Sequence, residues 1–518
     1  GLQALVSGGG GANPSTMFRY HAGNTPHRIA LVDGDRRYGF FEIDEQIDAA
    51  ARAMHHGGVR QGDKVLIMLH NRAEFLFVQA ACGRLGAAAV SVGSRSTSAE
   101  LRYIIDHAGA RALFFEATEV AVVREAMTAS KHGMGRRVIA VGDALTDFDN
   151  YAEWLAQAHD APSPPDRATD GAVVVYTSGT TGKPKGAVRK FSVSVVSQLL
   201  HFLERTPMRV QQTHLTACPL YHSTAFGFTS LSFLLGSKVI LLDRFEPRLF
   251  LDALARHHVV HTAIVPTMLH RVLELGEAEI AKYDLSSLQA IICGGAPLSP
   301  RLAERARAVF GLKLFNFYGS TETGLVTVAT PQDLEMAPGT VGRAIPGNDL
   351  RLFDEDGRRC AAGEVGELFV CSGNLIEGYH ADRAATDASM RDGYFSVGDL
   401  ARCDDRGYWF IEGRKRDMII LGGVNVYPVE VEAALVECQG VAEASVIGVE
   451  DEEWGERVCA FVVPVDPGAI DESDVLTHCR ATLAGPKRPR EVHFIDILPR
   501  NPTGKVLKRE LRARRARC

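Results

Sequence analysis

The sequence lacks closely spaced cysteines, a long hydrophobic run and a strong excess of either charge. Its ten cysteines form no Cys-x-x-Cys pair, and the nearest two, Cys360 and Cys371, are eleven residues apart. This spacing excludes a zinc-ribbon site and a dense disulfide scaffold, and it favours reduced thiols in a cytosol. Gly236–Lys238 interrupts the best candidate for a transmembrane helix, Phe226–Leu242, so no run is long enough to span a bilayer. We also expect no secretory signal.

The length and the charge distribution narrow the class of protein further. A chain of 518 residues is too long for one ordinary core, so we expect at least two domains. The net charge of −6 argues against nucleic-acid binding. Basic residues gather in Gly485–Cys518, and a basic end suits an anionic substrate, a cofactor phosphate or a membrane surface. A solvated helix face explains the last ten residues equally well. We therefore predict a cytoplasmic protein, with peripheral membrane contact through the basic end left open.

Strand and helix patterns alternate over the first two thirds of the chain. The pattern predicts a strand at Lys64–Leu69, a helix at Ala73–Leu85 and a strand at Ala87–Val92, and similar units recur around the helix predicted at Pro300–Phe310. Alternation of this kind predicts layered α/β subdomains with mostly parallel sheets. From about Gly339, short strands separated by glycine-rich turns predict a small β-rich, barrel-like subdomain.

A dense charged junction, Gly413–Asp417, separates this region from a compact α+β pattern, whose first helix begins at Pro428. We therefore predict an N-terminal domain over residues 1–415 and a small, mobile α+β C-terminal domain over residues 416–518. A solvated surface turn is the alternative interpretation of the junction.

The segment Thr177–Gly186 carries the strongest functional signal and follows the apolar run Ala172–Tyr176, which predicts a buried strand. It is rich in glycine, hydroxyl groups and lysine: Thr177, Ser178, Gly179, Thr180, Thr181, Gly182, Lys183, Lys185 and Gly186. Glycines let backbone N–H groups approach a ligand, while hydroxyls and lysines contact phosphate oxygens, so we predict a polyphosphate nucleotide. The usual NTPase loop is excluded, because Gly179 and Gly182 are too close and Pro184 stands where a hydroxyl would hold magnesium.

A second polar segment, Tyr318-Gly319-Ser320-Thr321-Glu322-Thr323-Gly324, follows a predicted strand. Tyr318 is suited to stack on a base, Thr321 to contact phosphate and Glu322 to bind the magnesium that the first loop cannot hold. A buried tyrosine followed by a helix N-terminus is the alternative. The presence of a phosphate loop elsewhere in the chain favours the functional interpretation.

Two weaker patterns support the same ligand. Gly294 and Gly295, followed by Ala296, allow close backbone approach to a flat ring. Asp399 is suited to accept hydrogen bonds from ribose hydroxyls, and Arg414 to complete that contact. Each pattern alone is typical of an ordinary turn, so only the set indicates a nucleotide site.

In these motifs the chain resembles the adenylate-forming superfamily of acyl-CoA synthetases, luciferases and peptide-synthetase adenylation domains, and it looks most like a fatty-acyl-CoA synthetase. The resemblance extends from about Thr25 to Lys508. The matching motifs occur in the family's order at Tyr176–Gly186, Tyr318–Gly324, Tyr394–Asp399, Gly413–Pro428 and Pro499–Lys505.

The resemblance implies ATP, Mg²⁺ and coenzyme A as ligands, and it assigns a role to each motif. The loop Thr177–Lys185 holds the β- and γ-phosphates, Tyr318 stacks on adenine beside Gly294–Ala296, and Asp399 and Arg414 contact the ribose. Gly319 and Thr321 complete the nucleotide contacts. Glu322 is the magnesium ligand, and it joins Thr181, His222 and Lys505 as the catalytic residues. The partners implied are a small carboxylic acid and coenzyme A, and a homodimer is compatible with the family.

The resemblance also implies two half-reactions. A carboxylate attacks the α-phosphorus of ATP beside Lys505, and a thiol then attacks the acyl-adenylate to give a thioester and AMP. Arg416 matches the hinge about which the small domain turns, although the family more often has Asp or Lys there. Gly422 and Gly423 match the segment along which the thiol approaches. His222 matches an aromatic gate between the carboxylate and the nucleotide.

The acid to be activated is predicted from the segments that match the acyl pocket. Phe226, Gly227, Val265 and Met268 offer no charge to pair with an ammonium group, which favours an apolar acyl or aryl chain over an amino acid. Ordinary core packing is the alternative for at least half of them. A second departure, Arg189-Lys190-Phe191 in place of a His-x-Asn segment, leaves the subfamily open.

Two other functions stay open on the sequence alone. The thiol acceptor is coenzyme A or the phosphopantetheine of a carrier protein. From another class, a nucleotide-binding regulatory protein without catalysis is disfavoured by the intact Lys505, Glu322 and phosphate loop.

Overall fold

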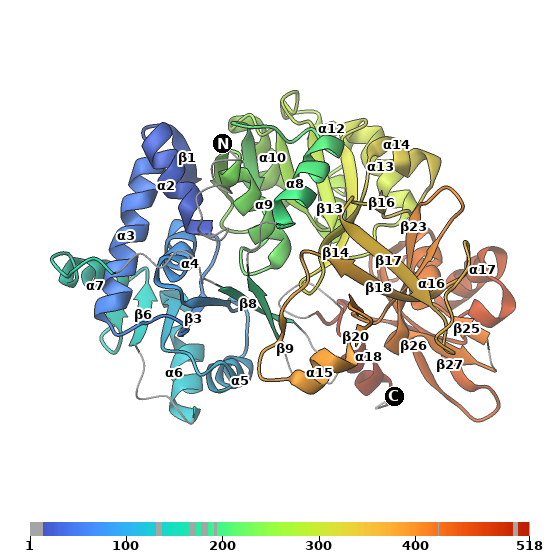
Figure 1. The fold of residues 1–518 in the computed structure, drawn as a ribbon. Coiled ribbons are helices and arrows are strands. Elements are labelled where there is room, and N and C mark those ends of the chain that lie inside the picture. The colour runs from blue at the N-terminus through green and yellow to red at the C-terminus, as the bar shows by residue number, and fades with distance from the viewer. Residues whose placement is uncertain are drawn as a thin grey trace.

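A computed structural model describes residues 14–130, 137–164, 172–177, 185–190, 194–422, 424–500 and 506–516. These residues form four sheets with helices around them. Figure 1 shows the N-terminal part at the left and the C-terminal part at the lower right. This arrangement confirms the predicted α/β fold class with a large N-terminal part and a small C-terminal one.

Sheet 1 has nine strands around a parallel centre. In spatial order they are β16 (Arg343–Ala344), β15 (Gly324–Ala329), β14 (Leu314–Ser320), β13 (Ala290–Gly294), β12 (His261–Ile264), β10 (Thr213–Thr216), β11 (Lys238–Leu241), β1 (Ile29–Asp33) and β2 (Arg36–Gly39). The strands from β14 to β1 pair in parallel, and antiparallel strands flank them at both edges.

Sheet 2 has eight strands, and it pairs in parallel from β8 to β7 with antiparallel strands at one edge only. Its order is β19 (Gly378–Tyr379), β9 (Lys185–Lys190), β8 (Ala172–Thr177), β4 (Ala88–Ser91), β3 (Lys64–Met68), β5 (Ala112–Glu116), β6 (Arg137–Val141) and β7 (Asp149–Asn150). Strand β19 comes from a distant part of the chain and pairs with β9, so residues near 378 lie beside the strand that follows the predicted phosphate loop.

Helices connect and cover the strands of sheets 1 and 2. They are α2 (Pro14–Asn24), α3 (Phe40–His56), α4 (Ala73–Leu85), α5 (Ser98–Ala108), α6 (Val120–Ala129), α7 (Tyr151–Gln157), α8 (Ser194–Arg205), α9 (Ser223–Leu234), α10 (Pro247–Arg256), α11 (Pro266–Leu273), α12 (Glu277–Ile280), α13 (Pro300–Phe310) and α14 (Pro331–Met336). The predicted helices Ala73–Leu85 and Pro300–Phe310 have the expected bounds.

Helix α4 shows how the two sheets share a core. All its residues are buried, which explains why its sequence is apolar on nearly every side. The helix ends at Gly86, whose φ of 65° is the left-handed conformation that glycine adopts most easily. One hydrophobic cluster includes α4, Ile67 of sheet 2 and Val239 of sheet 1, so the two α/β subdomains are joined by a continuous core.

Sheet 3 consists of six antiparallel strands and forms the small β subdomain expected after Gly339. Its strands are β17 (Asn348–Phe353), β18 (Gly366–Ser372), β20 (Met390–Arg391), β21 (Tyr394–Phe395), β22 (Asp399–Cys403) and β23 (Trp409–Arg414), and α15 (Arg383–Ala388) precedes β20. Its core includes Val326 of β15, so this subdomain packs directly on the edge of sheet 1.

Sheet 4 and its helices form the small C-terminal part. Its strands are β24 (Ile419–Leu421), β25 (Val424–Val426), β26 (Val441–Asp451), β27 (Gly455–Pro464) and β28 (Glu491–Phe494), with helices α16 (Pro428–Val436), α17 (Glu472–Thr482) and α18 (Lys508–Arg515). The predicted α+β pattern and the helix start at Pro428 are confirmed. The domain boundary between residues 415 and 416 stays a prediction.

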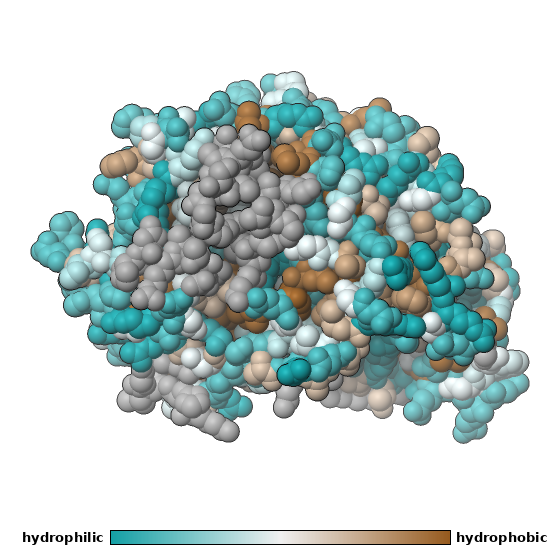
Figure 2. Space-filling view, in the orientation of Figure 1, coloured by the Kyte–Doolittle hydropathy of each residue, from teal (hydrophilic) through white to brown (hydrophobic). Residues whose placement is uncertain are grey.

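Several cations of the basic helix α18 lie beside acidic side chains. Lys508 Nζ is 2.8 Å from Glu432 Oε1, and Arg515 Nε is 3.2 Å from Glu491 Oε1. These ion pairs attach α18 to helix α16 and to strand β28 of sheet 4, and contact of its remaining cations with a membrane stays a prediction. In the described part of the chain no helix has the length and hydropathy needed to cross a bilayer. Figure 2 shows a mostly hydrophilic face, with hydrophobic residues visible mainly near its centre.

Candidate active site

The segment predicted to bind the polyphosphate joins two paired strands. β8 and β9 run antiparallel from the pair Ala172–Lys190 to the pair Thr177–Lys185. The connection therefore leaves sheet 2 at Thr177 and returns to it at Lys185. Six of the predicted phosphate-binding residues lie outside the described residues, so their roles stay predictions: Ser178, Gly179, Thr180, Thr181, Gly182 and Lys183.

The motif Tyr318–Gly324 forms the turn between β14 and β15. The chain turns directly into an antiparallel strand at Gly324, so the alternative of a helix N-terminus is wrong. Gly319 is required here, because a β-carbon at this position would lie 2.1 Å from the carbonyl oxygen of Gly324. The Ser320 hydroxyl accepts hydrogen bonds from the backbone N–H groups of Glu322 and Thr323, both at 3.1 Å. These contacts fix the conformation of the turn that carries Glu322.

Tyr318, Asp399 and Arg414 form a cluster, joined by a hydrogen bond and an ion pair, where sheet 1 meets sheet 3. The Tyr318 hydroxyl donates to Asp399 Oδ2 at 2.7 Å, and Arg414 Nε lies 3.0 Å from Asp399 Oδ1. Asp399 and Arg414 are opposite each other in the β22–β23 pair. The sequence placed these three residues in one nucleotide site, and the structure brings them together.

Burial strengthens the electrostatics of this cluster. The Asp399 side chain is 7% exposed, so its charge acts on its partners with little screening by water. Burial, and then the charge of Asp399, raise the pKa of the Tyr318 hydroxyl well above its ordinary value. The charge of Asp399 also raises the pKa of Arg414. Tyrosine and arginine therefore stay protonated at neutral pH, so the Tyr318 hydroxyl keeps its hydrogen bond to the carboxylate and Arg414 keeps its ion pair.

Glu322 is a buried carboxylate in the β14–β15 turn, 7% exposed. The hydroxyl of Tyr379 donates to Glu322 Oε1 at 3.1 Å, and the backbone N–H of Ile376 donates to the Glu322 carbonyl oxygen at 2.9 Å. A carboxylate oxygen is the kind of ligand that Mg²⁺ prefers, so the residue present fits the predicted metal. The turn also lies against α9, because Ser223 Oγ and Thr321 Oγ1 are 3.2 Å apart.

The glycines at the end of β13 bring backbone close to a neighbouring ring. A β-carbon on Gly294 would lie 2.4 Å from the ring of Phe317, so only glycine fits there. Gly295 has a φ of +79°, in the left-handed region, and both Gly295 and Ala296 are exposed. The chain therefore presents an open stretch of backbone beside β14, as a flat ligand requires.

The residues predicted to line the acyl pocket come from the starts of two helices. His222 is the N-cap residue of α9, and the backbone N–H of Phe226 donates to its carbonyl oxygen at 3.0 Å. Gly227 is exposed, and a β-carbon at this position would have no other atom within 4 Å. Val265 is the N-cap residue of α11, and its Cγ1 lies 3.7 Å from where Gly295 would carry a β-carbon.

Two of these residues also pack in hydrophobic cores. Phe226 packs against the cluster shared by sheets 1 and 2, and Met268 packs against the core on the other side of sheet 1. Met268 Sδ also accepts a hydrogen bond from the Cys218 thiol at 3.5 Å. The alternative of core packing thus holds in part for Phe226 and Met268, while Gly227 and Val265 stay open to a ligand role.

Gly422 forms the turn between β24 and β25, where the sequence predicts the path of the thiol. Its φ is +57°, and a β-carbon would lie 2.6 Å from the ring of Trp454. The backbone N–H of Gly422 donates to the Trp454 carbonyl oxygen at 2.7 Å. Gly423 and Lys505 lie outside the described residues, so their roles stay predictions.

The predicted hinge lies in a short 3₁₀ helix, η3 (Lys415–Asp417), between β23 and β24. The Arg416 side chain is 41% exposed, and its Nε is 3.9 Å from Asp417 Oδ2. Arg512 Nη2 of α18 lies 3.7 Å from Asp417 Oδ1. Exposed pairs at such distances contribute little to stability, which suits a pivot, although rotation about it stays a prediction.

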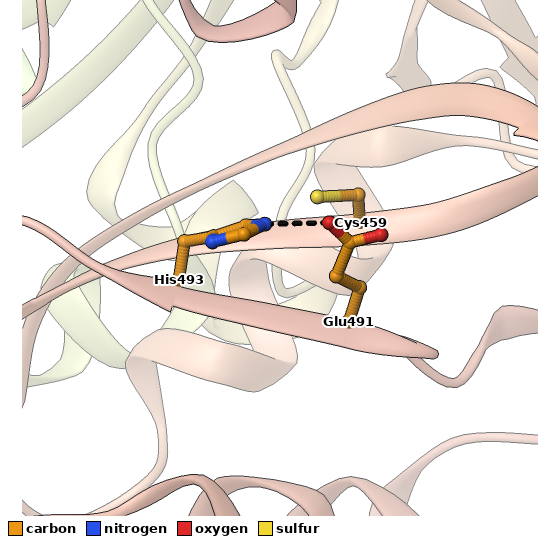
Figure 3. Close-up of side chains that lie close together, drawn as sticks. All are labelled: Cys459, Glu491 and His493. Atoms are coloured by element: carbon orange, nitrogen blue, oxygen red, sulfur yellow. Dashed lines mark hydrogen bonds and ion pairs between the residues drawn. The ribbon is translucent and has the colours of Figure 1, made fainter. Parts of the chain in front are cut away.

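A second group of potential metal ligands lies in sheet 4. Within the described ranges, Cys459, Glu491 and His493 are the one trio whose ligand atoms lie close enough to share an ion (Figure 3). Glu491 pairs with His493 at 2.6 Å and with Arg457 at 3.0 Å, and burial raises the pKa of the Cys459 thiol to about 12. A thiol and an imidazole are not ligands that Mg²⁺ prefers, so this trio is not the magnesium site.

Two residues of the site were not assigned a role by the sequence. Tyr379 contacts Glu322 from β19, and Arg189 contacts Thr321 from β9. Gly378-Tyr379 carries no local signal of function. The position of Tyr379 in the site follows from the pairing of β19 with β9. The residues near 379 give no indication of that pairing.

Comparison with known proteins agrees with this geometry. Residues 18–380 match the family model for AMP-binding enzymes, and residues 430–505 match the AMP-binding enzyme C-terminal domain. The chain is 34% identical over 492 residues to a feruloyl-CoA synthase of an Amycolatopsis species, with 95% of this chain and 96% of that protein covered. It is 31% identical over 507 residues to the long-chain-fatty-acid–CoA ligase FadD13 of Mycobacterium tuberculosis, with 96% and 98% covered.

A solved structure is similar over nearly the whole length. The o-succinylbenzoate CoA synthetase of Bacillus subtilis, in complex with its acyl-adenylate intermediate, gives a TM-score of 0.84 at 29% identity and covers 96% of this chain and 97% of that one. The fold and the site therefore define an ATP-dependent, adenylate-forming enzyme. The chain belongs to the AMP-binding enzyme family. It is an AMP-forming acid–thiol ligase that uses ATP, Mg²⁺ and coenzyme A.

Proposed function

We propose that this ligase is an acyl-CoA synthetase that activates an apolar aliphatic or aromatic carboxylic acid and transfers the acyl group to coenzyme A. The observation that carries the proposal is the buried cluster of Tyr318, Asp399 and Arg414, with Glu322 in the adjoining turn. The Tyr318 ring suits a base, the Asp399 carboxylate suits a ribose, and the Glu322 carboxylate suits a cation bound to the phosphates.

In the first half-reaction, the acid attacks the α-phosphorus of ATP and pyrophosphate leaves. Two anions must approach each other, so positive charge is needed around the phosphates. We assign that role to Lys183, Lys185 and Lys505, and we assign Glu322 to hold Mg²⁺. The metal, when bound, would neutralise phosphate charge as a Lewis acid. Asp399 and Arg414 would hold the ribose, so that the α-phosphorus stays in a fixed position while the bond forms.

In the second half-reaction, the thiol of coenzyme A attacks the acyl carbonyl and AMP leaves. A bulky thiol needs a path that Lys505 would block, so we propose that residues 416–518 turn about Arg416 between the two steps. The turn at Gly422 and Gly423 would then line the path. The two ion pairs of Asp417 are long and partly exposed, so they contribute little to stability and can break at low cost during this motion.

The substrate class is supported by the residues around the predicted pocket and by the relatives. Phe226, Val265 and Met268 bring no charge, and the open space beside Gly227 leaves room for an apolar chain or ring. The relatives include one named for an aromatic acid and one named for long-chain fatty acids, so we propose an apolar acid without committing to either type.

The test is a panel of carboxylic acids assayed for AMP and pyrophosphate, with and without coenzyme A. We expect AMP release to require an aliphatic or aromatic acid and to rise when coenzyme A is added. If AMP release rises only with a phosphopantetheinylated carrier protein, that protein and not coenzyme A is the thiol acceptor. ADP as the nucleotide product, or no turnover with any acid, would overturn the proposal.

A further inference from the structure

Arg189 reaches from sheet 2 to the turn that carries Glu322. It lies on β9, opposite Val173 of β8 and four positions beyond Lys185. Its Nη2 donates to the carbonyl oxygen of Thr321 at 2.5 Å. Its Nη1 would be 3.2 Å from a β-carbon on Gly324, so the guanidinium lies against both ends of the turn.

The burial of this guanidinium needs a physical reason. Burial lowers the pKa of Arg189 to about 10, and the nearby charge of Glu322 acts in the opposite direction. Arg189 therefore stays cationic at neutral pH. Its hydrogen bond to the Thr321 turn goes to a neutral peptide oxygen and not to a carboxylate. Holding a partly buried cation against a neutral acceptor costs free energy, so its position is better explained by a functional requirement than by stability.

The same strand carries other parts of the site. Lys185 begins β9, and its Nζ is 4.9 Å from the ring centre of Tyr379. Tyr379 pairs with Ala187 in the β9–β19 ladder and donates to Glu322 Oε1. One strand of sheet 2 thus connects Lys185, at the end of the phosphate loop, to two of the contacts made with the Glu322 turn of sheet 1.

From this geometry we infer that Arg189 is a positioning residue, which holds the Thr321–Glu322 turn so that the Glu322 carboxylate faces the cation bound to the nucleotide phosphates. The inference rests on the proposed function, because it takes Glu322 as the magnesium ligand. Arg189 acts through the Thr321 carbonyl group and not by contact with the metal. Its strand also carries Lys185, so this lysine and the proposed metal ligand are linked through one strand.

The test compares ATP binding with and without the metal. The dissociation constant of ATP is measured by calorimetry, in the absence of acid, once in excess Mg²⁺ and once in EDTA, and the ratio gives the enhancement by Mg²⁺. We expect Arg189→Met to lower this enhancement by about tenfold, as loss of an outer contact to a metal ligand typically does, and Glu322→Ala to lower it at least as much. The dissociation constant of AMP should not change.

Two further variants separate positioning from general stability. Arg189→Lys keeps a cation and a donor and should retain most of the enhancement. Arg72→Met removes another partly buried arginine, which pairs with Glu74 at 2.8 Å and with Glu116 instead of the turn, and should leave the enhancement unchanged. If Arg189→Met does not fold, Arg189→Gln can be compared with Arg189→Lys. This pair again contrasts a side chain without the cation with one that keeps it.

The possible results are distinguishable. Equal weakening of ATP binding with and without Mg²⁺ would overturn the inference, because it indicates direct phosphate contact by Arg189. An unchanged enhancement in Arg189→Met would overturn it as well, and if the wild-type enzyme still forms AMP from an acid the proposed function survives. Failure of the wild-type enzyme to form AMP with any acid would contradict both the inference about Arg189 and the proposed function.

Discussion

The nucleotide cluster and the hinge segment are neighbours in the chain, yet they are built in opposite ways. Asp399 is 7% exposed and is held at 2.7 Å and 3.0 Å by Tyr318 and Arg414. Two residues beyond Arg414, Arg416 is 41% exposed and its ion pair with Asp417 is 3.9 Å long. Short buried contacts fix a geometry, whereas long exposed ones can break at little cost. The comparison contrasts short, buried contacts at the predicted nucleotide site with long, more exposed contacts at the predicted hinge.

The sharpest way to test this contrast is to remove Lys505, the proposed catalytic lysine of the small domain. Lys505→Ala should slow pyrophosphate release by roughly 100-fold or more, because it removes a charge that stabilises the transition state. Thioester formation from supplied acyl-adenylate should be largely unchanged, because that step needs the domain in its other position. The measurement is the rate of each half-reaction separately.

A matched variant controls for the loss of a lysine. Lys487→Ala removes a cation that pairs with Glu430 at 2.7 Å on the same small domain, and it should change neither rate. Equal loss of both half-reactions in Lys505→Ala would contradict the two-position scheme.

The cluster of Tyr318, Asp399 and Arg414 can be weakened by replacing Asp399. Asp399→Ala leaves the Arg414 guanidinium and the Tyr318 hydroxyl without their shared acceptor, and we expect the KM for ATP to rise roughly tenfold to hundredfold. The chain offers a matched control, because Asp349 also lies between a tyrosine and an arginine, Tyr394 and Arg351, but is 55% exposed. Asp349→Ala should leave the KM for ATP unchanged, and similar effects of the two variants would show that burial is not what matters.

The interior of sheet 1 predicts a dependence of stability on pH. His214 and His261 face each other with their Nδ1 atoms 2.9 Å apart, and burial lowers both pKa values, that of His261 to about 3. The unfolded chain therefore binds more protons than the native one below the ordinary histidine pKa of about 6.5. For His261 this contribution to stability is complete above that pH and is lost as the pH falls towards 3, by about 1.4 kcal/mol per pH unit.

The measurement is urea unfolding across this range of pH. The wild-type free energy of unfolding should fall as the solution is acidified, and His261→Gln should reduce the slope. Identical slopes for the two proteins would show that the histidine pair does not titrate in this way.

The smallest expected effect concerns the thiol path. Gly422→Ala places a side chain at a φ of +57° against the Trp454 ring, at a cost of about 1 kcal/mol or more. We expect thioester formation to slow roughly fivefold, with pyrophosphate release unchanged. Gly363→Ala is the control, because Gly363 has a φ of +84° but no neighbour within 4 Å. A loss confined to the first half-reaction would contradict the assignment of Gly422.

Local patterns predicted most of the secondary structure. The helices Ala73–Leu85 and Pro300–Phe310 have the bounds predicted from their apolar spacing and their end residues. Strands were correct in place but differed by a residue or more at their ends, as for Ala87–Val92, where β4 covers Ala88–Ser91. Strand ends depend on where a neighbouring strand stops pairing, and that neighbour is distant in sequence.

The chain by itself determined the motifs that mark an adenylate-forming enzyme, because turn glycines, hydroxyls and apolar runs act over a few residues. Only the tertiary structure decided that Arg189 and Tyr379 hold the Glu322 turn, from 132 and 57 residues away along the chain. It also decided that the turn after β14 leads to a strand and not to a helix. The physical reason is that these contacts depend on the order of strands in two packed sheets, which no stretch of neighbouring residues encodes.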